Sequence, residues 1–178
     1  RFDTDDADVE IARQLKGRVD LLEKAEEAGK LKPSVASIRT GADRVAGSNT
    51  DGLIVAVIDT GVDYRHPDLA ANMWRNPLER ANGLDDDNNG LVDDFFGASY
   101  LSGRATGNPM DRNGHGTHCA GTVAAVANGT GVVGMAQTKI MALQFMDAPE
   151  GQQGRGSLND AIKCIDYARR HKADIMSN

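Results

Sequence analysis

The sequence has few cysteines, no long apolar run and no basic stripe, and each absence excludes a class of protein. Two cysteines, Cys119 and Cys164, cannot form the framework of several disulfides that stabilises small secreted domains. No apolar run approaches the ~20 residues that a membrane-spanning helix needs, so we expect no transmembrane segment. A net charge of -6 without a cluster of Lys and Arg argues against a nucleic-acid partner.

The chain is long enough for one globular domain preceded by a charged segment. Its 178 residues are 40% hydrophobic and include 20 glycines, which is typical of a compact, turn-rich protein. Apolar residues at helical spacing predict an amphipathic helix over residues 8–28. We interpret residues 1–38 as a linker or propeptide remnant and residues 39–178 as the folded domain. Because the sequence starts at Arg1 without Met or a signal sequence, we expect a processed or truncated piece.

Apolar runs and helical periods alternate along the domain in the order expected of an α/β fold. Continuous apolar stretches predict buried parallel strands, and Ser157 followed by Asp160 predicts the N-cap of a helix. This order predicts a mostly parallel sheet with right-handed crossovers and an open edge at the last strand. The expected strands are residues 53–58, 95–100, 139–146 and 173–177, and the expected helices are 157–171 and 115–127, the latter ended by Asn128-Gly129.

An acid and a histidine occupy two positions where α/β proteins gather reactive groups. Asp59 ends the first apolar run, so it is predicted at the carboxyl edge of the sheet. His115 stands between Gly114 and Gly116 at the start of a predicted helix. A carboxylate bonded to one ring nitrogen orients an imidazole so that the other nitrogen can take a proton from a hydroxyl. Each residue alone has a common structural explanation, but the pair in these contexts predicts a proton relay.

Three stretches of the sequence resemble the subtilisin-like serine proteases. They are VAVIDTGVDYRHPDL at residues 55–69, NGHGTHCAGT at 113–122 and GVVGMAQTKIMALQFMD at 131–147, within a likeness that covers roughly residues 40–178. The resemblance implies a three-layer α/β fold with a mostly parallel sheet, incomplete at the C-terminus. It also implies that Asp59 orients and stabilises the imidazole while His115 acts as general base and then general acid.

The nucleophile of that family does not occur in these residues. Its serine lies in a GTSMA-type motif and its oxyanion Asn follows a later strand, and the 178 residues contain neither. The resemblance therefore implies a fragment of a calcium-dependent serine endopeptidase that is inactive by itself. One alternative is a non-catalytic, calcium-stabilised binding or structural module derived from such an enzyme, and another is a truncated gene product. Intact Asp59 and His115 favour the enzyme.

A run of acidic residues predicts a calcium site. Residues 85–94, DDDNNGLVDD, carry five carboxylates and no Lys or Arg, and these charges repel one another unless a cation intervenes. Their spacing matches the first half of an EF-hand loop. Phe96 stands where the closing Glu would be, so the loop is not an EF-hand, and a solvated acidic turn is the alternative. The candidate ligands are Asp85, Asp87, Asn89, the carbonyl of Leu91, Asp93 and Asp94.

The family resemblance implies two further sites. The Asp of the HPDL motif binds calcium in subtilisin-like proteases, and the matching groups here are Asp68, Asn128 and the carbonyls of Val126, Thr130 and Val132. The family also binds an extended peptide or protein substrate as an added strand. The matching edge here is Gly154, Arg155, Gly156 and Ser157. The resemblance further implies a zymogen with an inhibitory propeptide and a secreted or vesicular location.

Overall fold

The structure of the protein is a computed structural model, and it describes residue 50 and residues 52–178 apart from 130 and 151. The predicted helix at 8–28 and the predicted segment 1–38 lie outside the described residues. Among the helices that are described, none has the length and apolar character needed to cross a bilayer.

A five-stranded sheet forms the centre of the described fold, with the strand order β3-β2-β4-β1-β7. Four of these strands are parallel, and β3 runs antiparallel to β2 at one edge. A short antiparallel pair, β5 with β6, forms a separate ribbon. The predicted α/β class with a mostly parallel sheet is confirmed. The strand bounds are β1 Ile54–Asp59, β2 Gly97–Leu101, β3 Arg104–Thr106, β4 Lys139–Gln144, β5 Met146–Asp147, β6 Arg155–Gly156 and β7 Ile175–Ser177.

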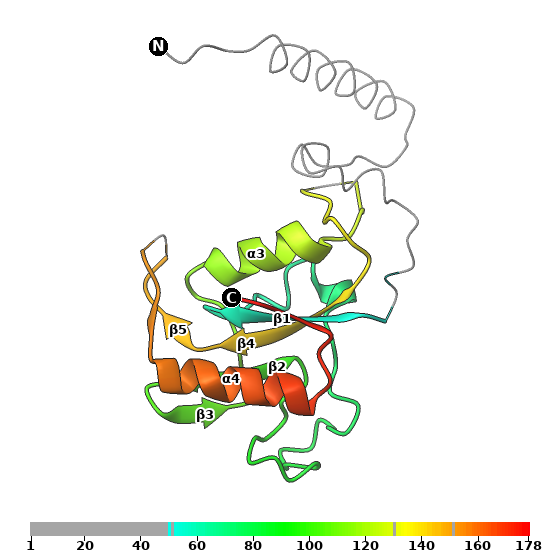
Figure 1. The fold of residues 1–178 in the computed structure, drawn as a ribbon. Coiled ribbons are helices and arrows are strands. Elements are labelled where there is room, and N and C mark those ends of the chain that lie inside the picture. The colour runs from blue at the N-terminus through cyan, green and yellow to red at the C-terminus, as the bar shows by residue number, and fades with distance from the viewer. Residues whose placement is uncertain (1–49, 51, 130, 151) are drawn as a thin grey trace, which may run out of the picture.

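One helix covers each face of the sheet, so the fold has three layers (Figure 1). The helices are α3, His115–Ala124, and α4, Leu158–Arg170, with a 3-10 turn, η2, at Ala70–Asn72. Alternate residues of β1 face opposite helices. Val55 and Val57 belong to the core cluster that includes residues of α3, whereas Ala56 and Ile58 belong to the cluster that includes residues of α4. A strand buried on both faces must be apolar throughout, which explains the unbroken apolar run.

Two helix ends show how far local sequence determines the boundaries. The predicted N-cap of α4 is confirmed, because the Ser157 hydroxyl oxygen accepts the backbone N–H of Asp160 at 3.1 Å. The predicted end of α3 near residue 127 is wrong, since Ala125 is already extended. The chain leaves the helix there because Val126 N–H donates to the Asp68 carbonyl at 2.8 Å and Gly134 N–H donates to the Ala125 carbonyl at 2.9 Å. Tertiary hydrogen bonds therefore end this helix before Asn128-Gly129.

The hairpin between β2 and β3 was not predicted. Its two-residue turn is Ser102-Gly103, and both residues have positive φ angles of 51° and 78°. Paired positive φ values suit the twist of a tight hairpin. The local signal was a Ser-Gly pair, which is a weaker hairpin signal than Asn-Gly.

Gly97, the first residue of β2, provides a test of the sheet's packing. Its φ is +130°, and an added Cβ would overlap the backbone of Ala142 in β4. We expect Gly97→Ala to lower the free energy of unfolding by about 3 kcal/mol through overlap and backbone strain. Urea denaturation followed by circular dichroism measures the change. Gly103→Ala is the matched control, because Gly103 also has positive φ but open space around it; an equal loss in both variants would contradict the packing argument.

Candidate active site

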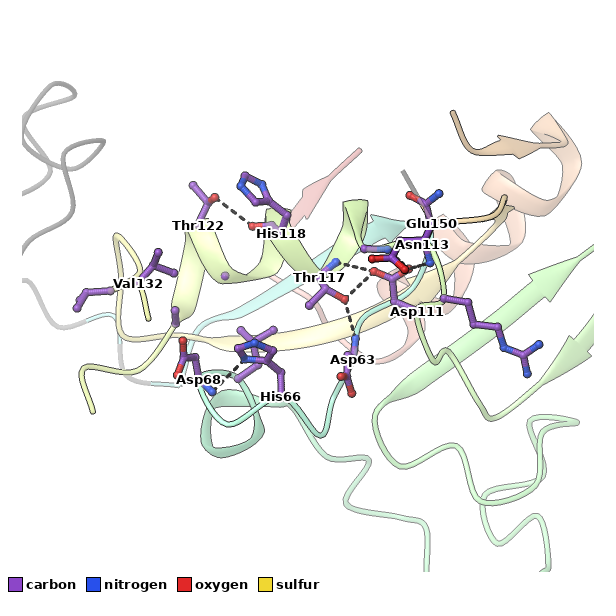
Figure 2. Close-up of a pocket in the computed structure, with 16 residues that line it drawn as sticks. Asp63, His66, Asp68, Asp111, Asn113, Thr117, His118, Thr122, Val132 and Glu150 are labelled. Atoms are coloured by element: carbon purple, nitrogen blue, oxygen red, sulfur yellow. Dashed lines mark hydrogen bonds between the residues drawn. The ribbon is translucent and has the colours of Figure 1, made fainter. Parts of the chain in front are cut away.

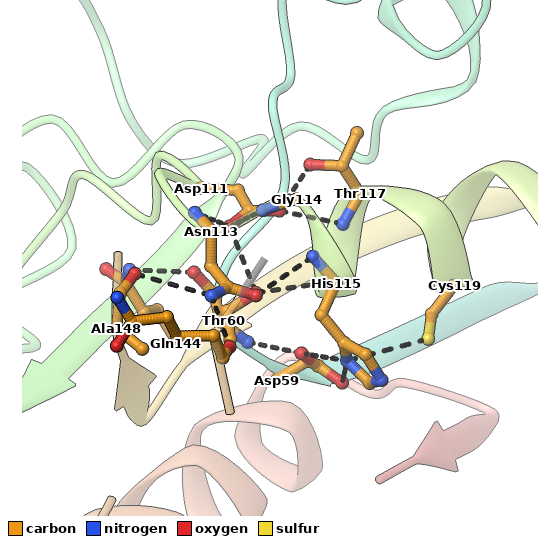
Figure 3. A network of polar contacts seen from close by, with 12 residues as sticks. Asp59, Thr60, Asp111, Asn113, Gly114, His115, Thr117, Cys119, Gln144 and Ala148 are labelled. Carbon is orange, nitrogen blue, oxygen red and sulfur yellow. Dashed lines mark hydrogen bonds and ion pairs between the residues drawn. The ribbon is translucent and has the colours of Figure 1, made fainter. Parts of the chain in front are cut away.

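The carboxylate of Asp59 and the imidazole of His115 meet at the carboxyl edge of the sheet (Figure 3). His115 Nδ1 lies 2.8 Å from both Asp59 oxygens. The Asp59 side chain is 8% exposed and the His115 side chain is 64% exposed. Because a carboxylate only accepts, the ring hydrogen belongs on Nδ1, which leaves Nε2 able to accept a proton. The predicted meeting of these two side chains is therefore observed, with the acid buried and the base open to solvent.

The first turn of α3 is held against the end of β1 by a close backbone approach. Gly116 N–H donates to the Thr60 hydroxyl oxygen at 3.0 Å, one residue beyond Asp59. A Cβ at Gly116 would overlap the Gly61 carbonyl oxygen. Only glycine permits this separation, so the Gly116 of the sequence motif is needed for packing between the two elements.

Asn113 connects the start of α3 to the loop before β6. Its buried side-chain amide donates to the carbonyls of Pro149 at 2.9 Å and Gln152 at 2.8 Å. The same amide's oxygen accepts the backbone N–H of His115 at 3.3 Å. Asn113 opens the NGHGTHCAGT motif but was not predicted as a site residue, because its partners are backbone carbonyls that only the fold brings near.

The predicted peptide-binding stretch lies beside the end of β1. Gly154 approaches Thr60 closely enough that a Cβ there would lie 3.0 Å from the Thr60 side chain. Arg155 and Gly156 form β6 and are exposed. Ser157 differs in role from its neighbours, because its hydroxyl is the N-cap of α4 and also donates to Asp160 at 2.7 Å. The backbone of this stretch is therefore better placed to meet a ligand than the Ser157 side chain.

Cys119 lies one helical turn after His115, with its Sγ 3.9 Å from His115 Nδ1. Burial, and then the negative charges of Asp59 and Asp111, raise the pKa of the Cys119 thiol above its ordinary value. A thiol that stays protonated is a poor nucleophile. Cys119 therefore packs beside the imidazole, as the helical spacing suggests, and does not replace a serine.

The acidic loop folds around a buried glutamate, Glu79, that was not among the predicted ligands. Glu79 is 8% exposed, and its carboxylate accepts the backbone N–H groups of Asp86, Asp87 and Asp93. Burial, together with the charges of Asp94 and Asp87, raises the pKa of Glu79. One carboxylate oxygen each from Glu79, Asp85 and Asp87 lies within 4.8 Å of the others. Glu79 precedes the acidic run in sequence, so only the folding of the loop reveals it.

The last acids of the run have different surroundings. Asp94 is fully buried and accepts from Asn76, Asn89 and the Tyr167 hydroxyl. Burial raises the pKa of Asp94 despite these donors. It lies with Asp87 and His171 in a second group whose ligand atoms are within 4.8 Å. Asp93 accepts the N–H groups of residues 82 and 83 at 3.4 and 3.3 Å and belongs to neither group.

The structure also places three of the residues expected at the second calcium site together. Asn128 Nδ2 donates to Asp68 Oδ1 at 2.8 Å, and Val126 N–H donates to the Asp68 carbonyl at 2.8 Å. Val132 is 54% exposed, and Thr130 lies outside the described residues. Asp68 and Val132 also line a cavity of about 630 Å³ beside α3 (Figure 2). Asp59 and His115 do not line this cavity, so it is separate from the acid–imidazole pair.

The fold and the site together define a class: a three-layer α/β protein with an acid–imidazole pair at the carboxyl edge of its parallel sheet. The sequence profile described as the subtilase family matches residues 50–178. This match covers most of the chain, and the chain belongs to the subtilase family.

Named relatives agree with this assignment. Subtilisin-like protease 1 of Plasmodium falciparum (isolate 3D7) is 41% identical over 127 residues, which are 69% of this chain and 18% of that protein. The thermophilic serine proteinase of Bacillus sp. (strain AK1) is 36% identical over 72% of this chain and 26% of its own length. The intracellular serine protease of Paenibacillus polymyxa is 37% identical over 71% of this chain and 32% of its own length. The matched part of the chain thus spans less than a third of each of these relatives.

The surroundings of the two cysteines predict a difference in alkylation. We expect iodoacetamide to label Cys119 slowly and Cys164 not at all in the folded protein, because Cys164 is fully buried. Asp59→Asn removes a negative charge that raises the Cys119 pKa, so it should speed labelling by about threefold. Mass spectrometry of timed digests measures both rates. Asp166→Asn, at a half-exposed position on α4, is the control. Faster labelling of Cys119 in that variant, or an unchanged labelling rate in Asp59→Asn, would contradict the electrostatic explanation.

Proposed function

We propose that this chain supplies the acid and the general base of a serine endopeptidase. The observation that carries the proposal is the contact between His115 Nδ1 and Asp59 at 2.8 Å, with Nε2 on the side away from the acid. In the proposed reaction, Nε2 takes the proton of a serine hydroxyl as that oxygen attacks the peptide carbonyl. The imidazolium then gives the proton to the leaving amine, and Asp59 stabilises the positive charge in between.

The serine and the oxyanion donor are proposed to come from parts of the whole protein that lie outside these 178 residues. The printed sequence holds no GTSMA-type motif. Ser177 is exposed in β7, outside any such motif, and we assign it no role as nucleophile. Without both groups, the acid–imidazole pair has no nucleophile to activate, so we propose that this polypeptide alone does not cleave peptides.

The substrate is proposed to be an extended peptide that adds to the exposed stretch 154–157. This stretch pairs on one side with β5, and its residues 155 and 156 are exposed. Gly154 and Gly156 let the stretch pack closely against the protein, since a Cβ at either position would meet Thr60 or the Phe145 carbonyl. Backbone pairing of this kind gives affinity without demanding a particular side chain. An inhibitory propeptide binding the same stretch is part of the proposal.

A non-catalytic binding module is the second candidate. A binding module does not need His115 to be held by Asp59 in one orientation, since any packed side chain at that position would serve a structural role. The observed exposure of the imidazole and its two-oxygen contact with Asp59 favour the enzyme. A secreted or vesicular location remains a proposal from the family resemblance. Relatives named as intracellular proteases show that membership alone does not determine the compartment.

We also propose that Ca²⁺ binds the acidic loop. Buried Glu79 and the nearby Asp85 and Asp87 present oxygen atoms, which suit a hard cation. Asn89 and the Leu91 carbonyl complete the proposed donor set, with Asp94 supporting the loop from its buried side. A bound cation would offset the mutual repulsion of these carboxylates. Asp68, Asn128 and the Val126 carbonyl are the proposed donors of a second, independent site.

The proton relay is tested by labelling and kinetics. A fluorophosphonate probe should label the whole protein and leave this polypeptide unlabelled. In the whole protein, Asp59→Asn should lower kcat by about 10⁴-fold because the imidazole loses its orientation. Peptide hydrolysis by stopped assay measures the loss, and Asp166→Asn serves as the control. Labelling of the isolated polypeptide, or full activity of Asp59→Asn, would refute the relay.

Calcium binding is tested by thermal unfolding in the presence and absence of a chelator. At about 100 times the dissociation constant, one bound ion adds about 2.7 kcal/mol to the free energy of unfolding. We therefore expect EDTA to lower the Tm by about 5–10 °C. Asp87→Ala should give a similar decrease and reduce the response to EDTA by the share that the loop contributes, whereas Asp166→Ala should retain the full response. A Tm that EDTA does not change would leave the loop as a solvated acidic turn.

A further inference from the structure

Asp111 accepts hydrogen bonds from both elements that carry the acid–imidazole pair (Figure 3). Its Oδ1 accepts the Thr60 hydroxyl at 3.0 Å, and Thr60 directly follows Asp59. Its Oδ2 accepts both the hydroxyl of Thr117 at 2.6 Å and the backbone N–H of Thr117 at 3.0 Å. Backbone N–H groups of Asn113 and Gly114 also donate to Oδ1, at 2.9 and 3.0 Å. One carboxylate therefore contacts the end of β1 and the first turn of α3.

The two threonine hydroxyls cross between the same two elements in opposite directions. Thr60, at the end of β1, accepts the N–H of Gly116 in α3 at 3.0 Å. Thr117, in α3, accepts the N–H of Asp63 in the chain after β1 at 2.9 Å. A hydroxyl has one hydrogen to donate and lone pairs to accept with. Because both hydroxyls donate to Asp111, both keep their lone pairs directed at the opposite element.

A negative charge at this position is stable. Burial alone would raise the pKa of Asp111, but hydrogen bonds from Thr117, Gly114 and Asn113 outweigh burial and lower the pKa below its ordinary value. The N-terminus of α3, whose first N–H groups have no acceptor within the helix and donate to side chains instead, further favours an anion there. Asp111 is therefore ionised near neutral pH and acts only as an acceptor. An amide in its place would present N–H groups to at least one of the two hydroxyls.

We propose that Asp111 is a positioning residue that sets the distance and orientation between Asp59 and His115. Within the described part of the chain, its carboxylate contacts the hydroxyl and backbone groups on either side of the pair and does not contact the imidazole. Its effect on the pair is exerted through Thr60 and Thr117. An effect of Asp111 on kcat rests on the proposed function, whereas an effect on the tautomer and orientation of the His115 imidazole does not.

The geometric consequence is measurable on this chain. In the unaltered protein, ¹⁵N NMR should show His115 in the Nδ1–H tautomer, with a low-field proton resonance from its bond to Asp59. Asp111→Asn should mix the two tautomers and broaden or remove that resonance. Asp166→Asn should leave both unchanged. An Asp111→Asn protein that folds and keeps the His115 signals of the unaltered protein would overturn the proposal.

Two substitutions of Thr60 provide a test if Asp111→Asn does not fold. Thr60→Ser keeps the hydroxyl that links Asp111 to Gly116, while Thr60→Val removes it at nearly constant volume. We expect Thr60→Ser to retain the His115 tautomer and Thr60→Val to lose it. Equal His115 spectra in these two variants would contradict the proposed role of the hydroxyl and of Asp111 behind it.

The catalytic consequence is tested in the whole protein. Displacing a reacting group by about 1 Å can cost about 100-fold in rate, so Asp111→Asn should lower kcat by about 10- to 100-fold with KM within about twofold. Asp166→Asn, at an ion-paired position on α4 far from the pair, should keep kcat near that of the unaltered enzyme. Unchanged kcat in Asp111→Asn would overturn the proposal. An unaltered whole protein without peptidase activity would instead refute the proposed function, and the tautomer measurement would still decide the role of Asp111.

Discussion

The close approach of the first turn of α3 to the end of β1 is the constraint on which the site depends. Gly116 allows the helix backbone to contact the strand end, where any side chain would overlap the Gly61 carbonyl. The acid and the imidazole are attached to these two backbones, so their 2.8 Å contact follows from how the backbones meet. The hydrogen bonds of Thr60, Thr117 and Asp111 hold that approach in one register.

The rest of the domain supports the same strand. β1 lies between β4 and β7 and is covered on both faces, so its carboxyl end has little freedom to move. The acidic loop is tied to α4, because Tyr167 donates to buried Asp94 and His171, at the end of α4, lies with its Nε2 3.6 Å from Asp87 Oδ2. Any cation held by the loop would therefore stabilise a helix that packs against the sheet. The proposed calcium site therefore supports the face of β1 opposite to the one that α3 covers.

Much of this arrangement was predictable, and the errors have physical causes. The buried strands and the N-cap Ser157 followed from local patterns, because an apolar run and a capping residue report their own surroundings. The end of α3 was misplaced because Asp68, distant in sequence, and Gly134, in the loop that follows the helix, supply the hydrogen bonds that replace the helix's own. Glu79 was missed because its burial depends on a loop that folds over it. Asn113 was missed because its partners are carbonyls of another loop.

The sequence by itself determined the family, the order of the four parallel strands and the two α-helices, and the two residues of the acid–imidazole pair. These rest on motifs and periodicities whose meaning is local, since neighbouring residues carry the whole signal. Only the tertiary structure decided that the two side chains meet and that Asp111 accepts from the residue that follows Asp59 as well as from α3. Those contacts join residues about 50 positions apart, and their geometry comes from packing across the sheet rather than from any single segment.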